Sequence, residues 1–309
     1  MTTIEQLSLP PRPLRECLCG CDKLEALDLS SRDGFITRLW GPEVHSFCHV
    51  TSWYWDHKPT SVATDGRAAM VDILECFETV IYCVFCREHY GKYVSHSPPR
   101  QAVDGQLHMW TLRLHNAINT RQHKLTFPES LYKTVYVDTC EAEAWAAGHV
   151  STRWLFWFWT ILYLTGLNHP PHLQQFEPRH LQIQVATDRL LRAMARVIPV
   201  EAKRFRSAFA SALANVAHQW SLYFAWLRCE LGVDLARSLP AHSCISFHTR
   251  ERAFHFMHDL ELETIRLYAA ASSTPPSSST TAAITTSVFG STCLDVATYF
   301  ERTYRVKPH

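Results

Sequence analysis

Apolar residues recur every three or four positions along most of the chain, which is the spacing of one face of an α-helix. The clearest stretch is 67–82, with apolar side chains at Ala69, Met70, Ile73, Leu74, Phe77, Val80 and Ile81. Similar spacing predicts helices at 39–54, from Cys83 towards Val94, at 108–123, within 180–232 and at 245–271. Asp65-Gly66 predicts a turn before the helix at 67–82. The pattern therefore predicts an all-α protein.

The most apolar run extends from Trp154 to Leu167 between the polar residues Arg153 and Asn168. It is shorter than the ~20 residues that a helix needs to cross a bilayer. This favours a buried helix or an interface over a membrane anchor. A helix that is aromatic on all sides needs cover on every side, so the chain that follows should pack onto it.

Composition divides the chain into five predicted parts. Residues 1–33 are rich in proline and irregular, and 34–145 and 146–271 are two helical domains. Residues 272–292 form a Ser/Thr/Pro-rich linker, and 293–309 form a short helix or tail. The second domain contains no recognisable chemistry.

Charge and cysteine content narrow the classes of function. The formal charge is +1, so nothing in the electrostatics favours nucleic acid or an acidic membrane as a partner. With 10 glycines and no glycine-rich phosphate loop, a nucleotide-binding parallel sheet is not expected. The N-terminus has no basic region followed by an apolar run, so we expect 11 cysteines in a reducing, intracellular compartment or in a virion. Close cysteine pairs are then more often catalytic or metal-binding than structural.

Cys83 and Cys86 form a Cys-x-x-Cys pair at the predicted start of a helix. Backbone amides at a helix N-terminus stabilise a thiolate, which makes the sulfur a good nucleophile and leaving group. The same pair with His89 offers three zinc ligands, but there is no second close pair at zinc-finger spacing. Cys83 and Cys86 could therefore be a redox pair or zinc ligands, and the redox pair is favoured.

Polar residues lie on one face of the predicted helix at 108–123, where His115, Asn116 and Asn119 follow Leu112 at helical spacing. They indicate either a local hydrogen-bond network or a stripe that binds the edge of a planar polar ligand. Lys124 at the helix end could meet a phosphate group. His45 and His49 share a face of the first helix, where packing or hydrogen bonding is favoured over a metal site.

Three segments resemble the Erv/ALR family of flavin-linked sulfhydryl oxidases, in the family's order. Trp40-Gly41-Pro42-Glu-Val-His45-Ser-Phe-Cys48-His49 is similar to the family's first helix, with His45 where tryptophan is usual. Tyr82-Cys83-Val-Phe-Cys86-Arg-Glu-His89-Tyr90 resembles the active-site segment, in the form seen in oxidases of large DNA viruses. Trp110-x4-His115-Asn116-x-Ile118-Asn119-x4-Lys124-x2-Phe127 resembles the flavin-binding segment, with His123 in place of a glycine.

The resemblance implies a four-helix bundle with a short fifth helix, usually dimeric, with FAD at its mouth. It implies that Cys86 lies against the flavin ring and that Cys83 exchanges with incoming dithiols. The predicted cofactor-binding residues are Trp40, Gly41, His45, His49, His89, Trp110, His115, Asn116, Asn119 and Lys124. The family's cysteine after Phe127 is absent, so Cys140 takes its place or this clamp is missing.

The sequence thus predicts an FAD-dependent thiol oxidase that acts on dithiol proteins, uses molecular oxygen and releases hydrogen peroxide. The predicted shuttle cysteines are Cys17, Cys19 and Cys21, for which irregular structural thiols are the alternative. A homodimer is expected, and no metal. The alternative function is a non-enzymatic zinc-binding or interaction protein that uses Cys83, Cys86 and His89. A degenerate oxidase fold kept for dimerisation is a weaker alternative.

Overall fold

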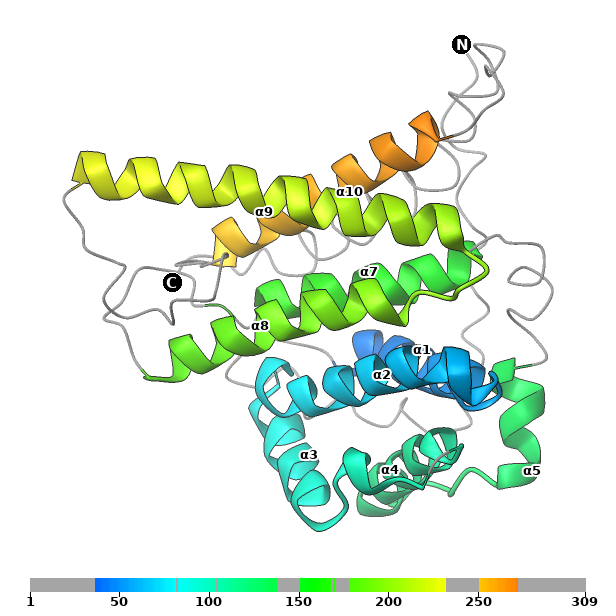
Figure 1. Cartoon of the computed structure of the whole chain (residues 1–309). Coiled ribbons are helices and arrows are strands. Elements are labelled where there is room, and N and C mark those ends of the chain that lie inside the picture. The colour runs from blue at the N-terminus through cyan, green and yellow to red at the C-terminus, as the bar shows by residue number, and fades with distance from the viewer. Residues whose placement is uncertain are drawn as a thin grey trace, which may run out of the picture.

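The computed structural model describes residues 37–81, 83–103, 105–137, 151–167, 169, 178–231 and 250–271. Within these ranges the chain forms helices and no strand, so the all-α prediction is confirmed (Figure 1). The predicted shuttle cysteines Cys17, Cys19 and Cys21, and also Cys140, lie outside the described residues.

The first part of the chain forms α1 (Thr37–Asp56), α2 (Thr60–Val80), α3 (Val84–His96), η3 (Pro99–Gln101), α4 (Leu107–Arg121), α5 (Glu129–Tyr132) and the π-helical turn η4 (Lys133–Val137). The second part forms α7 (Thr152–Leu167), α8 (Pro178–Val197), α9 (Lys203–Leu231) and α10 (Arg250–Ala270). The helical spacing predicted across 180–232 thus corresponds to two helices. They are separated by a short connection that contains Pro199, which cannot donate a backbone hydrogen bond.

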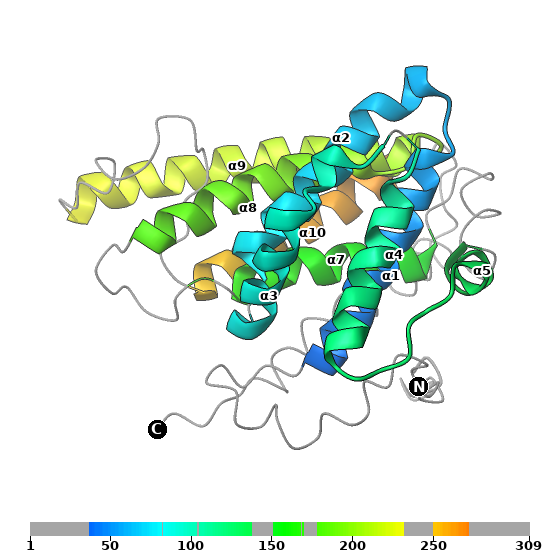
Figure 2. The same ribbon diagram turned by 90° about the horizontal axis from the view of Figure 1, so that it is seen from below.

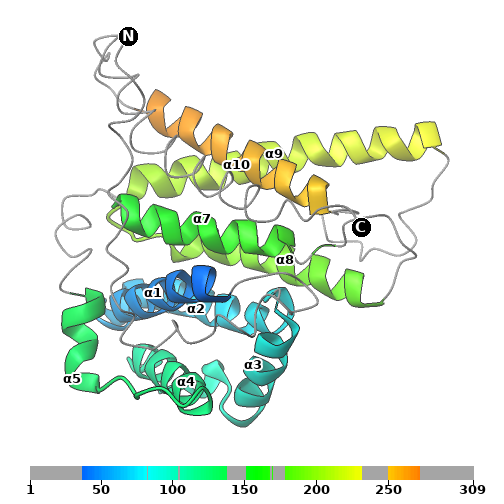
Figure 3. The same ribbon diagram turned by 180° about the vertical axis from the view of Figure 1, so that it is seen from behind.

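The helices are stacked in layers. In Figure 1, α3, α4 and α5 lie lowest, α1 and α2 lie above them, and α7 and α8 separate this pair from α9 and α10. The view from behind shows the same order (Figure 3), and the view from below shows α4 running along α1 (Figure 2). α8 packs on α2, α7 packs on α1 and α10, and α4 packs on α1. One side of α2 is therefore covered by α8 of the same chain.

One continuous apolar core runs through both halves of the chain. Trp55, which is 1% exposed, donates from Nε1 to the carbonyl of Val197 at 3.0 Å. Tyr54 accepts a hydrogen bond from the Val200 amide at 2.8 Å and donates to Glu201. These contacts fix the end of α1 on the α8–α9 connection. The boundary at 145/146 between two domains stays a prediction.

The predicted turn at Asp65-Gly66 is wrong, because both residues lie inside α2, which begins at Thr60. Gly66 is buried, and a Cβ there would overlap the indole ring of Trp55. The glycine therefore serves close packing of α2 on α1, a use that the local sequence does not distinguish from a turn.

The apolar run at 154–167 forms α7, and it is buried as predicted. Trp154, Phe158 and Trp159 are fully covered, and Phe205 and Phe209 of α9 stack edge-to-face against Phe158 at 5.9 and 5.0 Å between ring centroids. Among the described helices, none has the length and apolar character needed to cross a membrane.

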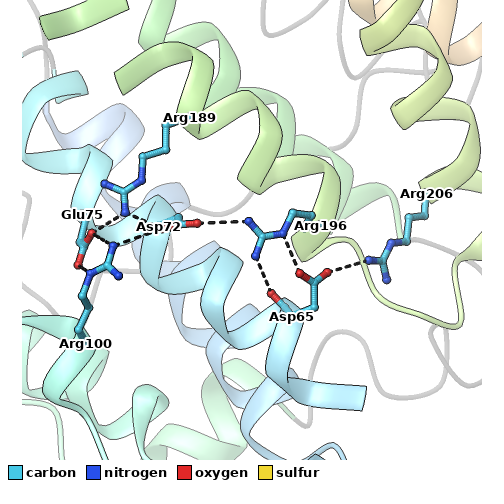
Figure 4. A network of polar contacts seen from close by, with 7 residues as sticks. All are labelled: Asp65, Asp72, Glu75, Arg100, Arg189, Arg196 and Arg206. Atoms are coloured by element: carbon cyan, nitrogen blue, oxygen red, sulfur yellow. Dashed lines mark hydrogen bonds and ion pairs between the residues drawn. The ribbon is translucent and has the colours of Figure 1, made fainter. Parts of the chain in front are cut away.

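An ionic network lies between α2, η3, α8 and α9 (Figure 4). Arg189 donates to both Asp72 and Glu75 at 2.5 Å, and Arg196 binds Asp65 at 2.9 Å. The network is completed by Arg100, which also binds Glu75, and by Arg206, which reaches Asp65 at 3.5 Å. Several of these carboxylates are shared between two guanidinium groups, which couples the α2–α8 contact to the α3–α4 connection.

A buried carboxyl group lies between α7 and α10. Glu261 is 3% exposed and accepts a hydrogen bond from the Tyr163 hydroxyl at 2.6 Å. Burial raises the pKa of Glu261 from 4.5 to about 7, although the bond from Tyr163 acts in the opposite direction. The folded chain therefore holds a proton that the unfolded chain releases at lower pH.

Wild type should lose stability as pH rises, and we expect Glu261→Gln to be free of this pH dependence. A raised folded-state pKa means that stability is fully present below about pH 4.5 and is lost as pH rises through about 7. The free energy of unfolding in urea should be measured for wild type and variant at pH 5 and at pH 8. At pH 5 the two proteins should have similar values. At pH 8 the variant should be more stable by about 2–3 kcal/mol. An equal pH dependence in both proteins would contradict this assignment.

Candidate active site

Cys83 is the N-cap residue of α3. Its Sγ accepts a hydrogen bond from the Cys86 amide at 3.3 Å, and its carbonyl accepts from the Arg87 amide at 2.9 Å. The prediction that a helix begins at the cysteine pair is confirmed. Cys83 is buried and Cys86 is partly exposed. Because the Cys83 sulfur already accepts an N–H at the positive end of a helix, this position favours its thiolate.

Two further contacts hold this helix start in place. Arg87 donates from Nη1 to the carbonyl of Ile81, the last-turn cap of α2, at 2.8 Å. Tyr90 donates to the carbonyl of Leu74 at 2.6 Å, which fastens α3 along α2. The cysteine pair therefore lies on a rigid junction between two helices. Neither Arg87 nor the Tyr90 contact was assigned a role from the sequence.

Three histidines from α1 and α4 lie together, as the spacing of each helix allowed. The rings of His45 and His115 are stacked at 4.1 Å between centroids with 12° between their planes. His49 Nε2 and His115 Nδ1 are 3.0 Å apart, and both residues are buried. The structure brings His45, His49 and His115 together, and their contact with a cofactor stays a prediction.

The histidines are neutral at pH 7. Burial and then the neighbouring His115 hold the pKa of His45 well below its usual range, with a smaller effect of Lys124. Burial and then Lys124 lower the pKa of His115 to about 4. The site therefore offers flat uncharged rings beside one ammonium group, a set suited to a planar ring that carries phosphate.

The same three histidines are the candidate metal ligands of the site. Among the described residues, His45, His49 and His115 are the group with ligand atoms at metal-compatible spacing, within 4.8 Å of one another. Cys83, Cys86 and His89 do not form such a group, and His89 lies on the exposed side of α3. Imidazole lone pairs lie in the ring plane. The lone pairs of stacked His45 and His115 therefore lie in two nearly parallel planes and cannot both point at one ion, which favours stacking over chelation.

The remaining predicted cofactor residues on α4 have structural contacts. The Asn116 amide donates to the Phe127 carbonyl at 2.9 Å and accepts from the Phe127 amide at 2.6 Å. The carbonyl of buried Asn119 accepts from the Lys124 amide at 2.9 Å, and Trp110 donates to the Ser97 carbonyl at 2.9 Å. Asn116 and Asn119 thus shape the loop that carries Lys124. Their contact with a cofactor stays a prediction.

The first turns of α1 pack against the end of α2, just before the cysteine pair. Trp40 and Val44 of α1 line a small apolar hollow together with the end of α2 and with Ile161 and Leu164 of α7. Val44 precedes His45, and Ile81 lies two residues before Cys83. Beside Trp40, a Cβ added to Gly41 would meet open space. That the histidines and the cysteine pair form one cofactor site stays a prediction.

His123 occupies the position after α4 where the family pattern has glycine. It has φ +56°, and it forms the left-handed residue of a helix-ending motif. Its amide donates to the Thr120 carbonyl at 3.1 Å, and the Lys124 amide donates to the Asn119 carbonyl at 2.9 Å. A left-handed conformation costs a residue with a Cβ roughly 1–2 kcal/mol.

We expect His123→Gly to stabilise the folded chain by about 1 kcal/mol, because glycine adopts this conformation without strain. His123→Ala is the matched control, since alanine keeps a Cβ and removes only the imidazole. Thermal unfolding of the three proteins measures both effects. If alanine stabilised as much as glycine, the imidazole and not the backbone would be the source of strain.

Comparison with known proteins gives one match. No curated protein and no solved structure is significantly similar to the chain. The Erv1 / Alr family model matches residues 42–137, which hold the histidine stack, the Cys83–Cys86 pair and the α4 loop. The chain is thus similar to the Erv1 / Alr family over residues 42–137 of its 309 residues.

Proposed function

We propose that the chain is an FAD-dependent thiol oxidase that forms disulfides in dithiol proteins and transfers the electrons to oxygen. The Erv1 / Alr family is known for FAD-linked sulfhydryl oxidase activity. The observation that carries the proposal is the position of Cys83 at the N-terminus of α3, with its Sγ accepting the Cys86 amide. A zinc or interaction role for Cys83, Cys86 and His89 has no such observation in its favour.

The reaction begins with the oxidised Cys83–Cys86 pair and a substrate dithiol. A substrate thiolate attacks the Cys83 sulfur, the Cys83–Cys86 bond breaks, and Cys86 leaves as a thiolate. The second substrate thiolate then attacks the substrate sulfur bonded to Cys83, which releases the substrate disulfide and the Cys83 thiolate. The helix N-terminus stabilises the Cys83 leaving group, which speeds this exchange. Two substrate thiols are oxidised and the cysteine pair is reduced by two electrons.

The histidine stack fits the flavin nucleotide by the chemistry of its groups. His45 and His115 offer flat neutral faces, and Lys124 offers a cation to the pyrophosphate. His45 covers less ring area than the tryptophan usual in the family. When bound, FAD accepts two electrons from Cys86 and passes them to oxygen, which leaves as hydrogen peroxide. This chain orients the sulfur and holds the ring.

We also propose a homodimer as the working form. α8 covers one side of α2 within the chain, so a second copy would need another face. Dithiol proteins and molecular oxygen are the expected partners, and no nucleic acid is expected.

Absorption of the purified full chain tests the proposal. We expect a yellow protein with flavin bands near one FAD per chain, and peroxide release when a dithiol is added. A colourless protein that carries stoichiometric zinc and releases no peroxide would contradict the oxidase and support the zinc-binding alternative. A yellow but inert protein would leave only the flavin-binding part of the proposal.

A further inference from the structure

Thr111 lies on α4 in the centre of a buried chain of hydrogen bonds. Its Oγ1 is 3.0 Å from His49 Nδ1 and donates to the His108 carbonyl at 2.7 Å. His49 Nε2 is in turn 3.0 Å from His115 Nδ1. Thr111 is 1% exposed, His49 0% and His115 6%, so water does not compete for these contacts. The chain thus links one hydroxyl group to two predicted cofactor-binding rings.

The direction of this chain follows from the single hydrogen of the Thr111 hydroxyl. The His108 carbonyl can only accept, and two oxygens 2.7 Å apart would repel each other unless that hydrogen lay between them. The hydroxyl hydrogen is therefore used on the carbonyl. The Tyr132 hydroxyl also lies beside Thr111, but it gives its own hydrogen to the His49 carbonyl at 2.9 Å. Towards the His49 ring, Thr111 can therefore only accept, which places a hydrogen on His49 Nδ1.

The next link is fixed by the charge of the rings. Burial and the neighbouring His115 hold the pKa of His49 well below its usual range, so the His49 ring carries one hydrogen only. Its Nε2 is therefore bare and accepts from Nδ1–H of His115. His115 is neutral as well, since burial and Lys124 lower its pKa to about 4. Its Nε2 is left as a hydrogen-bond acceptor.

We propose that Thr111 is a positioning residue: it fixes the tautomers of His49 and His115 so that His115 presents a bare Nε2 to the flavin nucleotide. The cofactor part of this inference rests on the proposed function. A flavin nucleotide carries hydroxyl groups and ring N–H groups, which are the donors that a bare imidazole nitrogen binds. The stacking of His45 on His115 fixes the orientation of the His115 ring, while Thr111 fixes its tautomer through His49.

The test uses the full chain with 15N-labelled histidine, in which ring nitrogen shifts separate a protonated from a bare nitrogen. His49→Gln and His115→Gln serve only to assign the signals. We expect a hydrogen on Nδ1 of both residues in wild type. Thr111→Val has nearly the same shape but accepts no hydrogen bond, so both rings should lose this preference. Thr111→Ser keeps the hydroxyl group and should keep both tautomers.

Flavin affinity provides the second measurement. Thr111→Val should bind FAD about tenfold more weakly, as expected for one misplaced neutral hydrogen bond, and Thr111→Ser within about twofold of wild type. A hydrogen on Nε2 of wild-type His115, or unchanged tautomers in Thr111→Val, would overturn the proposal. The wild-type spectrum decides the tautomer even if the valine variant does not fold. A chain that binds no FAD would contradict the proposed function, while its tautomers would still decide the role of Thr111.

Discussion

Cys86→Ser should abolish peroxide formation from a dithiol, with a loss on the order of 10³-fold or more. The serine hydroxyl cannot form the disulfide with Cys83 and cannot deliver electrons as a thiolate. Flavin content should be retained, because no predicted cofactor contact other than the sulfur is removed. Steady-state peroxide release per bound flavin measures the effect.

Cys83→Ser gives the same test with an internal structural control. Serine is a good N-cap residue, so the start of α3 should be preserved while the exchangeable sulfur is lost. Cys76→Ser is the matched control away from the site. Cys76 lies in α2, is 3% exposed, and burial raises the pKa of its thiol to about 12. Its variant should keep the activity per folded molecule. Activity retained in Cys86→Ser would end the oxidase proposal.

Gly66→Ala should destabilise the folded chain by about 3 kcal/mol or more. The new Cβ would overlap the indole ring of Trp55, which cannot move away because its Nε1 donates to Val197 and the residue is 1% exposed. The helices α1 and α2 would have to separate. Urea unfolding measures the loss of free energy.

Gly41→Ala is the matched control for this substitution. Gly41 also lies inside a helix, but a Cβ there meets nothing within 4 Å. Alanine should therefore change the stability by less than about 1 kcal/mol, because its better helix propensity is offset by the contact of its Cβ with the ring of the next residue, Pro42. If Gly66→Ala behaved like Gly41→Ala, the close contact of α1 and α2 would be wrong.

Sequence periodicity predicted most helices, because one buried face leaves a three-to-four residue repeat. The prediction failed at Asp65-Gly66, because a glycine is typical both of a turn and of a close contact between two helices. The partner of Gly66 is a side chain of a different helix, Trp55. Local sequence carries no information on such a contact.

The candidate site shows the same limit. The start of α3 at Cys83 follows from local pattern and was predicted correctly. Thr111 was not predicted, because its partner His49 lies 62 residues away in the sequence. Its only sequence signal is its spacing of four residues from His115, which puts the two side chains on one face of α4. Asn116 was assigned to cofactor binding, and its contact with Phe127 became visible only in the structure.

The network of Asp65, Asp72 and Glu75 with four arginines has a consequence for how this chain can change over time (Figure 4). Loss of Asp72 alone would remove the anion that Arg189 and Arg196 share and would leave each with one carboxylate, Glu75 and Asp65. Substitutions at these positions should therefore be inherited together, and related chains should retain or lose them as a set. We therefore expect the residues of this network in α2 and α8 to vary together among related chains.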